Sequence, residues 1–157
     1  MHDLAAIRPA TAADIPAMVG LLGRLFAIEV DFAFSPERQQ RGLELLLAAP
    51  QAMVLVAETA GGGVVGMATA QQLISTAEGG PALLVEDLVV ALDWRGQGIG
   101  TALLDELAAW GQGLGATRMQ LLADRTNAPA LHFYRQRAWQ ETPMVCLRKF
   151  LKGEKVQ

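Results

Sequence analysis

A glycine-rich turn between a strand-like and a helix-like segment is the part of this sequence best suited to bind a ligand. This glycine turn is Arg95-Gly96-Gln97-Gly98-Ile99-Gly100-Thr101, and the apolar run 83–90 precedes it. The first turn of a helix has backbone N–H groups without intrahelical acceptors, and the helix dipole adds positive potential there. Glycines let a ligand approach that backbone closely. The segment therefore predicts a site for a phosphate or pyrophosphate, although its glycines also suit an ordinary tight turn.

The spacing of the glycines separates three kinds of phosphate-binding loop. A P-loop needs a lysine to reach the terminal phosphate, and no lysine occurs near this turn. A dinucleotide fingerprint would place Thr101 where a small residue must pack the helix on its strand. A third pattern, R/Q-x-x-G-x-G/A, is matched in full by residues 95–100. A nucleoside triphosphate is therefore excluded, and a dinucleotide is disfavoured.

A second motif, N-x-x-A-x-x-F-Y, is matched by residues 127–134. With both motifs present, the chain resembles the GNAT family of N-acetyltransferases over essentially its whole length. The resemblance implies acetyl transfer from acetyl-CoA to an amine, without a metal. The family box usually closes with a glycine and an aromatic residue, and this chain has Ala138 and Trp139 there. We expect the alanine to alter that turn without preventing cofactor binding.

The resemblance also implies how acetyl-CoA binds. The pyrophosphate would bind the glycine turn, with Arg95 adding charge. The pantetheine arm would pair with the backbone of residues 88–90 like an added strand, and this requires the strand to splay from its neighbour at a bulge. The side chains of these three residues also suit the core. The residues implied to bind the cofactor are Leu88, Val89, Val90, Arg95, Gly96, Gln97, Gly98, Ile99, Gly100, Thr101, Asn127 and Tyr134.

Glu86 and Asp87 are adjacent acids in an otherwise apolar segment. Buried acids are costly unless they are paired or functional. Strict strand alternation would place Glu86 on one face with Leu88 and Val90, and Asp87 on the other. An alkyl ammonium has a pKa of about 10.4, so an attacking amine benefits from a base. The resemblance implies that Glu86 is this base or part of a water relay. The alternative is that one or both acids pair with an arginine, and Asp87 is assigned to structure.

Tyr134 is the single tyrosine of the chain. A phenol has a pKa of about 10 and keeps its proton at neutral pH. The resemblance implies that Tyr134 protonates the departing CoA thiolate, whereas the alternative is a packing aromatic. Asn127 is expected to cap the helix that carries Tyr134. In relatives the same asparagine also hydrogen-bonds the pantetheine or the substrate.

The resemblance implies an acceptor site between the first two helices and the last strands. Glu29, Asp31 and Phe32 fall in the loop that joins those helices, and Glu86 is counted with them. Acids beside aromatics suit a cationic amine, of a small molecule or a peptide. A solvated loop is an equally good interpretation. A different function, a non-catalytic acyl-CoA-binding regulatory module, would keep the glycine turn but could lose the acid and base.

Hydrophobic periodicity predicts the elements that must position these residues. Their order predicts an α/β fold, with a mixed, mostly antiparallel sheet of about seven strands and about four helices on both faces. Cys146 falls in the last strand and is expected in the core. The predicted strands are 4–8, 53–57, 64–74, 83–90 and 119–123, with short ones at Trp139 and 144–148; the predicted helices are 11–28, 36–49, 98–112 and 127–137.

Composition limits the classes of protein. A chain of 157 residues that is 52% hydrophobic predicts a single domain over 1–157 with a full core. A net charge of −3 without a Lys/Arg run argues against nucleic acid and anionic membranes as partners. The single cysteine excludes an internal disulfide, and no His/Cys cluster suggests a metal. Without a leader or a spanning segment, a cytoplasmic location is expected. The resemblance also suggests a homodimer.

Overall fold

The computed structural model describes residues 5–28 and 34–153, which form two compact units, 1–121 and 122–157. The single domain over 1–157 remains a prediction. The first unit contains β1 (Ala6–Pro9), a 3-10 turn (Ala12–Asp14), α1 (Ile15–Ile28), α2 (Pro36–Ala48), β2 (Ala52–Glu58), β3 (Val64–Ser75), β4 (Gly80–Val90), a second 3-10 turn (Leu92–Trp94), α3 (Ile99–Gly113) and β5 (Met119–Gln120). The second unit contains α4 (Ala128–Arg135).

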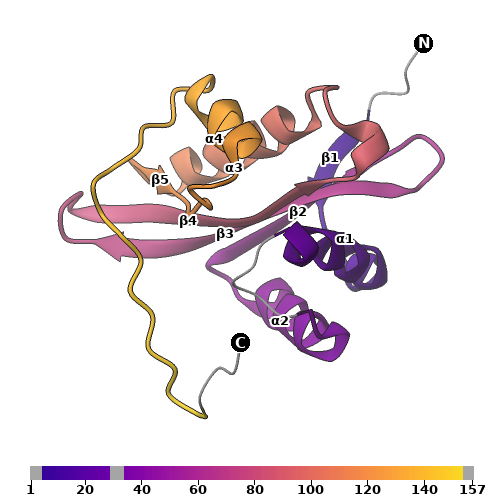
Figure 1. The fold of residues 1–157 in the computed structure, drawn as a ribbon, viewed down its shortest axis with the longest axis horizontal. Helices are drawn as coiled ribbons and strands as arrows, with labels where there is room; N and C mark the ends of the chain where they lie inside the picture. The colour runs from indigo at the N-terminus through magenta and orange to yellow at the C-terminus, as the bar shows by residue number, and fades with distance from the viewer. Residues whose placement is uncertain (1–4, 29–33, 154–157) are drawn as a thin grey trace. The chain divides into compact units, whose positions relative to one another are not determined.

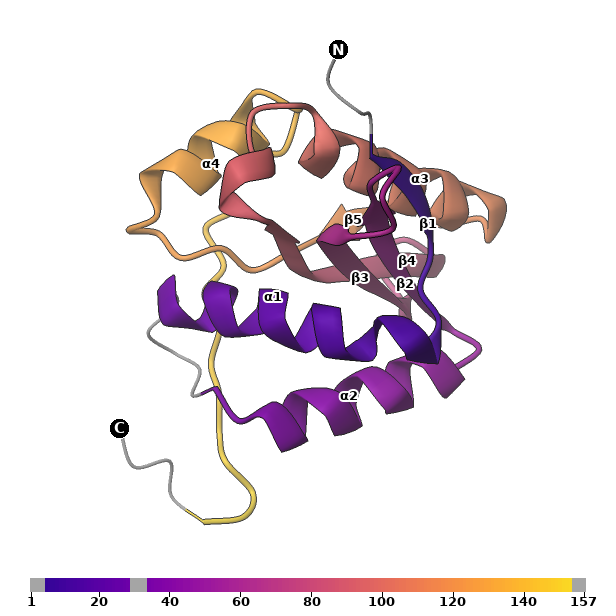
Figure 2. The same ribbon diagram turned by 90° about the vertical axis from the view of Figure 1, so that its right-hand side faces the viewer.

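The first unit is built on one sheet with the strand order β1-β2-β3-β4-β5. Neighbouring strands are antiparallel except β4 and β5, which are parallel. Within this unit, α1 and α2 lie on one face of the sheet and α3 on the other (Figures 1 and 2). The predicted α/β fold with helices on both faces of a mostly antiparallel sheet is confirmed.

Each face of the sheet has its own apolar layer. On one face, buried residues of α1 and α2 such as Met18 and Leu43 pack with Val56 and Met67 of the sheet. On the other face, a Cβ added at Gly66 would lie 3.2 Å from Ile99 and 3.4 Å from Leu103. Gly66 therefore lets the first turns of α3 lie close against β3. Because Gly66 is opposite Val90 in the ladder, this packing holds the start of α3 near the end of β4.

A charged cluster connects the segment between β1 and α1 to the sheet. The backbone N–H of Thr11 donates to the Asp14 carboxylate over 2.8 Å, as the capping-box pattern predicts. The Arg8 guanidinium contacts both Asp14 and Glu58 at 2.8 Å. Its hydrogen bond lowers the pKa of the Asp14 carboxyl below its ordinary value. The Arg8 cluster, which we define as Arg8, Asp14 and Glu58, therefore joins β1 and β2 to the approach to α1.

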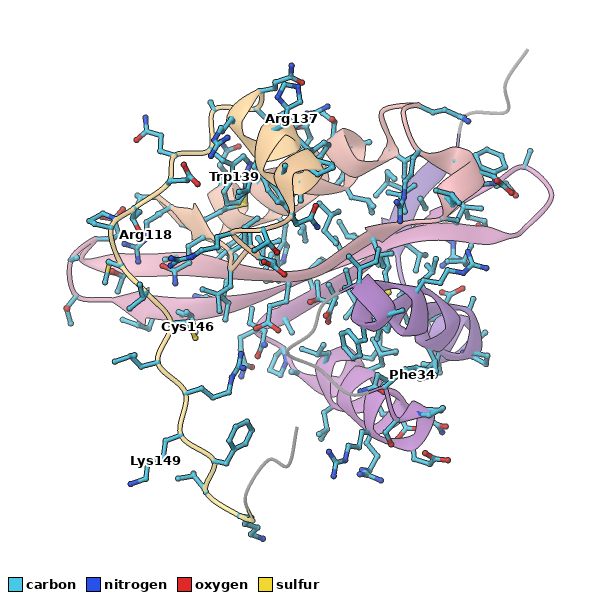
Figure 3. All side chains as sticks on the ribbon, in the orientation of Figure 1. Phe34, Arg118, Arg137, Trp139, Cys146 and Lys149 are labelled. Carbon is cyan, nitrogen blue, oxygen red and sulfur yellow. The ribbon has the colours of Figure 1, made fainter. Side chains whose placement is uncertain are left out.

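The predicted strand count is too high, because the described residues form a sheet of 5 strands. Residues 139–150 contain no helix or strand, so the strands predicted at Trp139 and 144–148 are wrong. Cys146 is correspondingly exposed and is not a core residue; it lies on this segment in Figure 3. The composition of 144–148 suits a strand, but a strand also needs a neighbour for its backbone. No described helix is long and apolar enough to cross a membrane.

Candidate active site

A β-bulge interrupts β4 directly after Glu86. Met67 is opposite Val89, and Thr69 is opposite Glu86, so two steps along β3 match three steps along β4. The extra residue falls at Asp87, whose φ of +55° lies in the left-handed region. A bulge of this kind bends the strand and interrupts its pairing. This bulge in β4 agrees with the splayed strand expected from the resemblance, and it lies next to Glu86, the predicted catalytic base.

The bulge corrects the face that strict alternation assigned to Glu86. Thr69 and Met67 are two residues apart on β3 and share a face, so their partners Glu86 and Val89 share it too. Glu86 therefore does not share its face with Leu88 and Val90, because one inserted residue reverses the alternation. The Glu86 side chain is also exposed rather than buried. Because Glu86 is exposed, the argument that a buried acid must be paired or functional does not apply to it.

Thr69 holds the bulge from the neighbouring strand. It is 2% exposed, and its hydroxyl donates to the backbone carbonyl of Glu86 over 3.2 Å. The same hydroxyl lies 3.5 Å from a carboxylate oxygen of Asp87. These contacts support the structural role predicted for Asp87. The sequence interpretation missed Thr69, whose one available signal is a polar residue within the apolar run of β3.

The edge of β4 opens after Leu84. β5 pairs with β4 only at Leu83 and Leu84. In the part of residues 1–121 that the structure describes, no strand pairs with this edge from Val85 to Val90. An unpaired strand edge can accept an extended ligand as an added strand. The predicted cofactor residues Leu88, Val89 and Val90 all lie along this open edge.

The glycine turn connects the end of β4 to α3. Gly96 has a φ of +77°, and Gly98, the N-cap of α3, has a φ of +83°. Other residues adopt these angles only with strain, so the backbone itself requires glycine here. No atom lies within 4 Å of a Cβ built at either position, so their surroundings are open. The helix start at Ile99 is within one residue of the prediction.

Arg95 is held at the same end of β4. Its Nε–H donates to the carbonyl of Val90 over 3.0 Å, and the side chain is exposed. The first i−4 hydrogen bond at the start of α3 is donated by Ala102 to Gly98. The backbone N–H groups at the start of a helix point away from its carbonyls, so they can be offered to a ligand. A guanidinium and a helix N-terminus thus stand together where an anion would be stabilised.

Asn127 and Tyr134 lie in the second unit. The Asn127 side chain accepts a hydrogen bond from the backbone of Ala130 over 3.2 Å, which confirms the predicted cap of α4. The Tyr134 ring meets the rings of Phe133 and Trp139 edge to face, with centroids 5.3 Å and 5.6 Å away. These contacts support the packing interpretation of Tyr134 without contradicting the acid role, because they involve its ring and not its hydroxyl.

Ala138 stands where the motif usually has glycine, and its φ is +64°. The backbone therefore takes up the left-handed turn that glycine favours. The alanine does not remove this turn but strains it.

The predicted acceptor residues Glu29, Asp31 and Phe32 lie outside the described residues. Phe34, just after them, packs its ring against Gly23 of α1, where an added Cβ would lie 3.1 Å from it. Among the described residues, no three His, Cys, Asp or Glu side chains form a group that could hold a metal ion.

A family model described as the acetyltransferase (GNAT) family matches residues 21–139. No curated protein sequence matches the chain. Among solved structures, a transcriptional regulator from Bacillus halodurans C-125 has a TM-score of 0.82 at 23% identity, covering 93% of this chain and 99% of its own. A predicted acetyltransferase from Clostridium acetobutylicum, solved with acetyl-CoA, has a TM-score of 0.76 at 19% identity, covering 93% and 96%. An aminoglycoside acetyltransferase from an uncultured soil metagenomic sample, in complex with sisomicin, has a TM-score of 0.74 at 25% identity, covering 95% and 97%.

Proposed function

Because the chain belongs to the GNAT family of acetyltransferases, we propose that it transfers the acetyl group of acetyl-CoA to a primary amine of a small molecule or a peptide. Acetyl-CoA is the co-substrate of this family. The observation that carries the proposal is the continuous path formed by the bulge, the open edge of β4 and the glycine turn. The extended amide chain of pantetheine requires an unpaired strand edge, and the pyrophosphate at its end requires a helix start.

The residues present fit acetyl-CoA. The open edge from Val85 to Val90 offers backbone groups to the amides of pantetheine. The glycine turn offers helix N–H groups to the pyrophosphate, and the space around Gly96 and Gly98 is open. A charged side chain introduced at Gly98 would occupy this open space. Arg95, fixed to Val90 through Nε, adds positive charge beside the turn.

The chemistry is a direct acyl transfer. The amine nitrogen forms a bond to the thioester carbonyl carbon, and the bond from that carbon to sulfur breaks. Before this attack the ammonium loses one proton, which Glu86 accepts directly or through water, and the nitrogen loses a second proton to water after the bond has formed. The sulfur leaves as a thiolate and receives a proton from the phenol of Tyr134. The products are an N-acetyl amide and CoA, and one net proton is released to solvent for each ammonium consumed.

The class of acceptor is proposed from charge and from one structural relative. Glu86 is an exposed carboxylate beside the bulge, and a carboxylate attracts a cationic amine before it is deprotonated. The relative solved with sisomicin acts on an aminoglycoside, which is a small molecule with several amines. These two points support a small polyamine or aminosugar more than a peptide. Glu29, Asp31 and Phe32 are proposed to contact the acceptor, and a homodimer is proposed as the assembly.

Thiol release from acetyl-CoA with a panel of amines tests this function. Wild type should turn over at least one amine, and Tyr134→Phe should lower kcat by about 100-fold if the phenol is the acid. Equal rates would refute the acid role. Tight binding of CoA without turnover of any amine would favour the non-catalytic binding module instead.

A matched pair of variants tests the glycine turn. Gly98→Asp and Gly98→Asn strain the backbone equally and have the same shape, but only Asp adds a negative charge. Aspartate should weaken CoA binding by at least tenfold relative to asparagine, because two negative charges would meet at the helix start. Equal affinity of the two variants, measured by calorimetry, would show that the pyrophosphate binds elsewhere.

A further inference from the structure

At the end of α4, Trp139 contacts both the main chain and the ring of Tyr134. We propose that Trp139 is a positioning residue that holds the Tyr134 ring in the orientation needed to protonate the thiolate. This inference rests on the proposed function. It goes beyond that function because neither the motif nor the comparisons assign a role to Trp139.

The backbone supplies the first part of the argument. The carbonyl of Tyr134 accepts a hydrogen bond from the N–H of Trp139 over 3.1 Å, and the carbonyl of Arg135 accepts one from Ala138 over 3.3 Å. Together with the left-handed Ala138, these bonds form a Schellman motif. An apolar contact often joins the residue that donates the longer of these two bonds to the residue that accepts it. In this chain those residues are Trp139 and Tyr134.

The side chains supply the second part. The rings of Tyr134 and Trp139 lie 5.6 Å apart with an interplanar angle of 63°. This edge-to-face arrangement is favourable for two aromatic rings and depends on their orientation. The backbone N–H of Trp139 is hydrogen-bonded to the carbonyl of Tyr134. Trp139 therefore constrains both the main chain and the ring of Tyr134.

A second ring completes the support. Phe133 meets Tyr134 at 5.3 Å and 79°. The Arg137 guanidinium lies 3.8 Å from the centre of the Phe133 ring, and Arg137 also donates to the Phe133 carbonyl over 2.8 Å. Arg137 and Trp139 are labelled in Figure 3 and belong to the second unit, which contains α4. The Tyr134 ring therefore contacts two aromatic neighbours, and one of them is itself held in place.

The consequence for catalysis follows from the geometry of proton transfer. A general acid must reach its acceptor within hydrogen-bond distance. A displacement of about 1 Å can lower a rate by about 100-fold. Loss of Trp139 should therefore lower kcat through Tyr134 by a larger factor than it changes the KM for acetyl-CoA, since the open strand edge and the glycine turn are untouched.

A double-mutant cycle tests the inference. Wild type, Trp139→Ala, Tyr134→Phe and the double variant are compared by kcat and KM for acetyl-CoA in the thiol-release assay. Trp139→Ala should lower kcat by about 3- to 10-fold, the range expected for an aromatic pair. The double variant should be no slower than Tyr134→Phe alone, because Trp139 acts only through the phenol. Trp139→Phe, which keeps an aromatic edge contact, should restore most of kcat.

The cycle separates the possible failures. If Trp139→Ala lowers kcat by the same factor with and without the phenol, Trp139 acts by another route and the inference is overturned. An unchanged kcat in Trp139→Ala also overturns it. A normal kcat in Tyr134→Phe instead refutes the acid role in the proposed function. Should Trp139→Ala fail to fold, Trp139→Leu keeps the apolar contact of the helix end without the ring, and the same comparison applies.

Discussion

Replacing Ala138 with glycine is expected to stabilise this protein, although glycine usually weakens a folded chain. Ala138 has a φ of +64° and closes the Schellman motif at the end of α4. A non-glycine residue in the left-handed region costs about 1–2 kcal/mol. Glycine loses about 0.5–1 kcal/mol more backbone entropy than alanine on folding. The difference is a net stabilisation of roughly 0.5–1 kcal/mol by Ala138→Gly.

Urea denaturation followed by circular dichroism measures this difference. With a slope near 2 kcal/mol per molar, the midpoint should rise by about 0.3–0.5 M. Ala130→Gly is the matched control, because it makes the same chemical change inside α4. There the backbone is helical, and glycine should lower stability by about 1 kcal/mol. The reasoning is refuted if both variants move the midpoint in the same direction, because the sign must then come from something other than φ.

Two further predictions concern the first unit. Thr69→Val keeps the shape of the side chain but removes the hydroxyl bonded to Glu86, so unfolding free energy should fall by about 1 kcal/mol and kcat/KM should fall several-fold. Thr69→Ser should recover most of kcat/KM, and no recovery would mean that the hydroxyl does not hold the bulge. Asp14→Asn removes one of the two carboxylate partners of Arg8 and should lower the free energy of unfolding at neutral pH by roughly 2 kcal/mol. Because the hydrogen bond from Arg8 lowers the pKa of Asp14, this contribution is present above the ordinary Asp pKa and is lost as pH falls through the folded value. The urea midpoints of wild type and Asp14→Asn should therefore converge below about pH 4, and a constant gap down to pH 2 would contradict the assignment.

Local features of the chain were predicted well because they depend on residues close together in sequence. The glycine turn lies at the start of a helix, and Asn127 caps α4. Capping and helix periodicity are set by backbone preferences within one or two turns of the helix. The family resemblance rested on two such local motifs, and it was confirmed.

The errors of the sequence analysis concern features that depend on pairing between distant segments. The strands expected at Trp139 and 144–148 required a neighbour that their composition does not specify. The bulge at Asp87 is defined by its register with Thr69 and Met67, so counting along β4 alone assigned Glu86 to the wrong set of neighbours. The burial of Thr69 and the exposure of Glu86 follow from the same pairing.

The sequence by itself determined an anion-binding turn, because helix N-termini and glycine conformations are local properties that a motif can encode. The resemblance to the GNAT family, carried by two such motifs, then indicated the co-substrate. The sequence also marked Ala138 as a departure from the usual motif, followed by Trp139 at the position where the motif has an aromatic residue. Only the tertiary structure decided what those residues do: a left-handed alanine lets the N–H of Trp139 reach the carbonyl of Tyr134. Only the tertiary structure shows that the edge of β4 beyond Leu84 is not paired with β5. It also shows that Glu86 shares a face of the sheet with Val89. A strand edge and a face exist only once a neighbouring strand has fixed the register, and register is a relation between segments that are far apart along the chain.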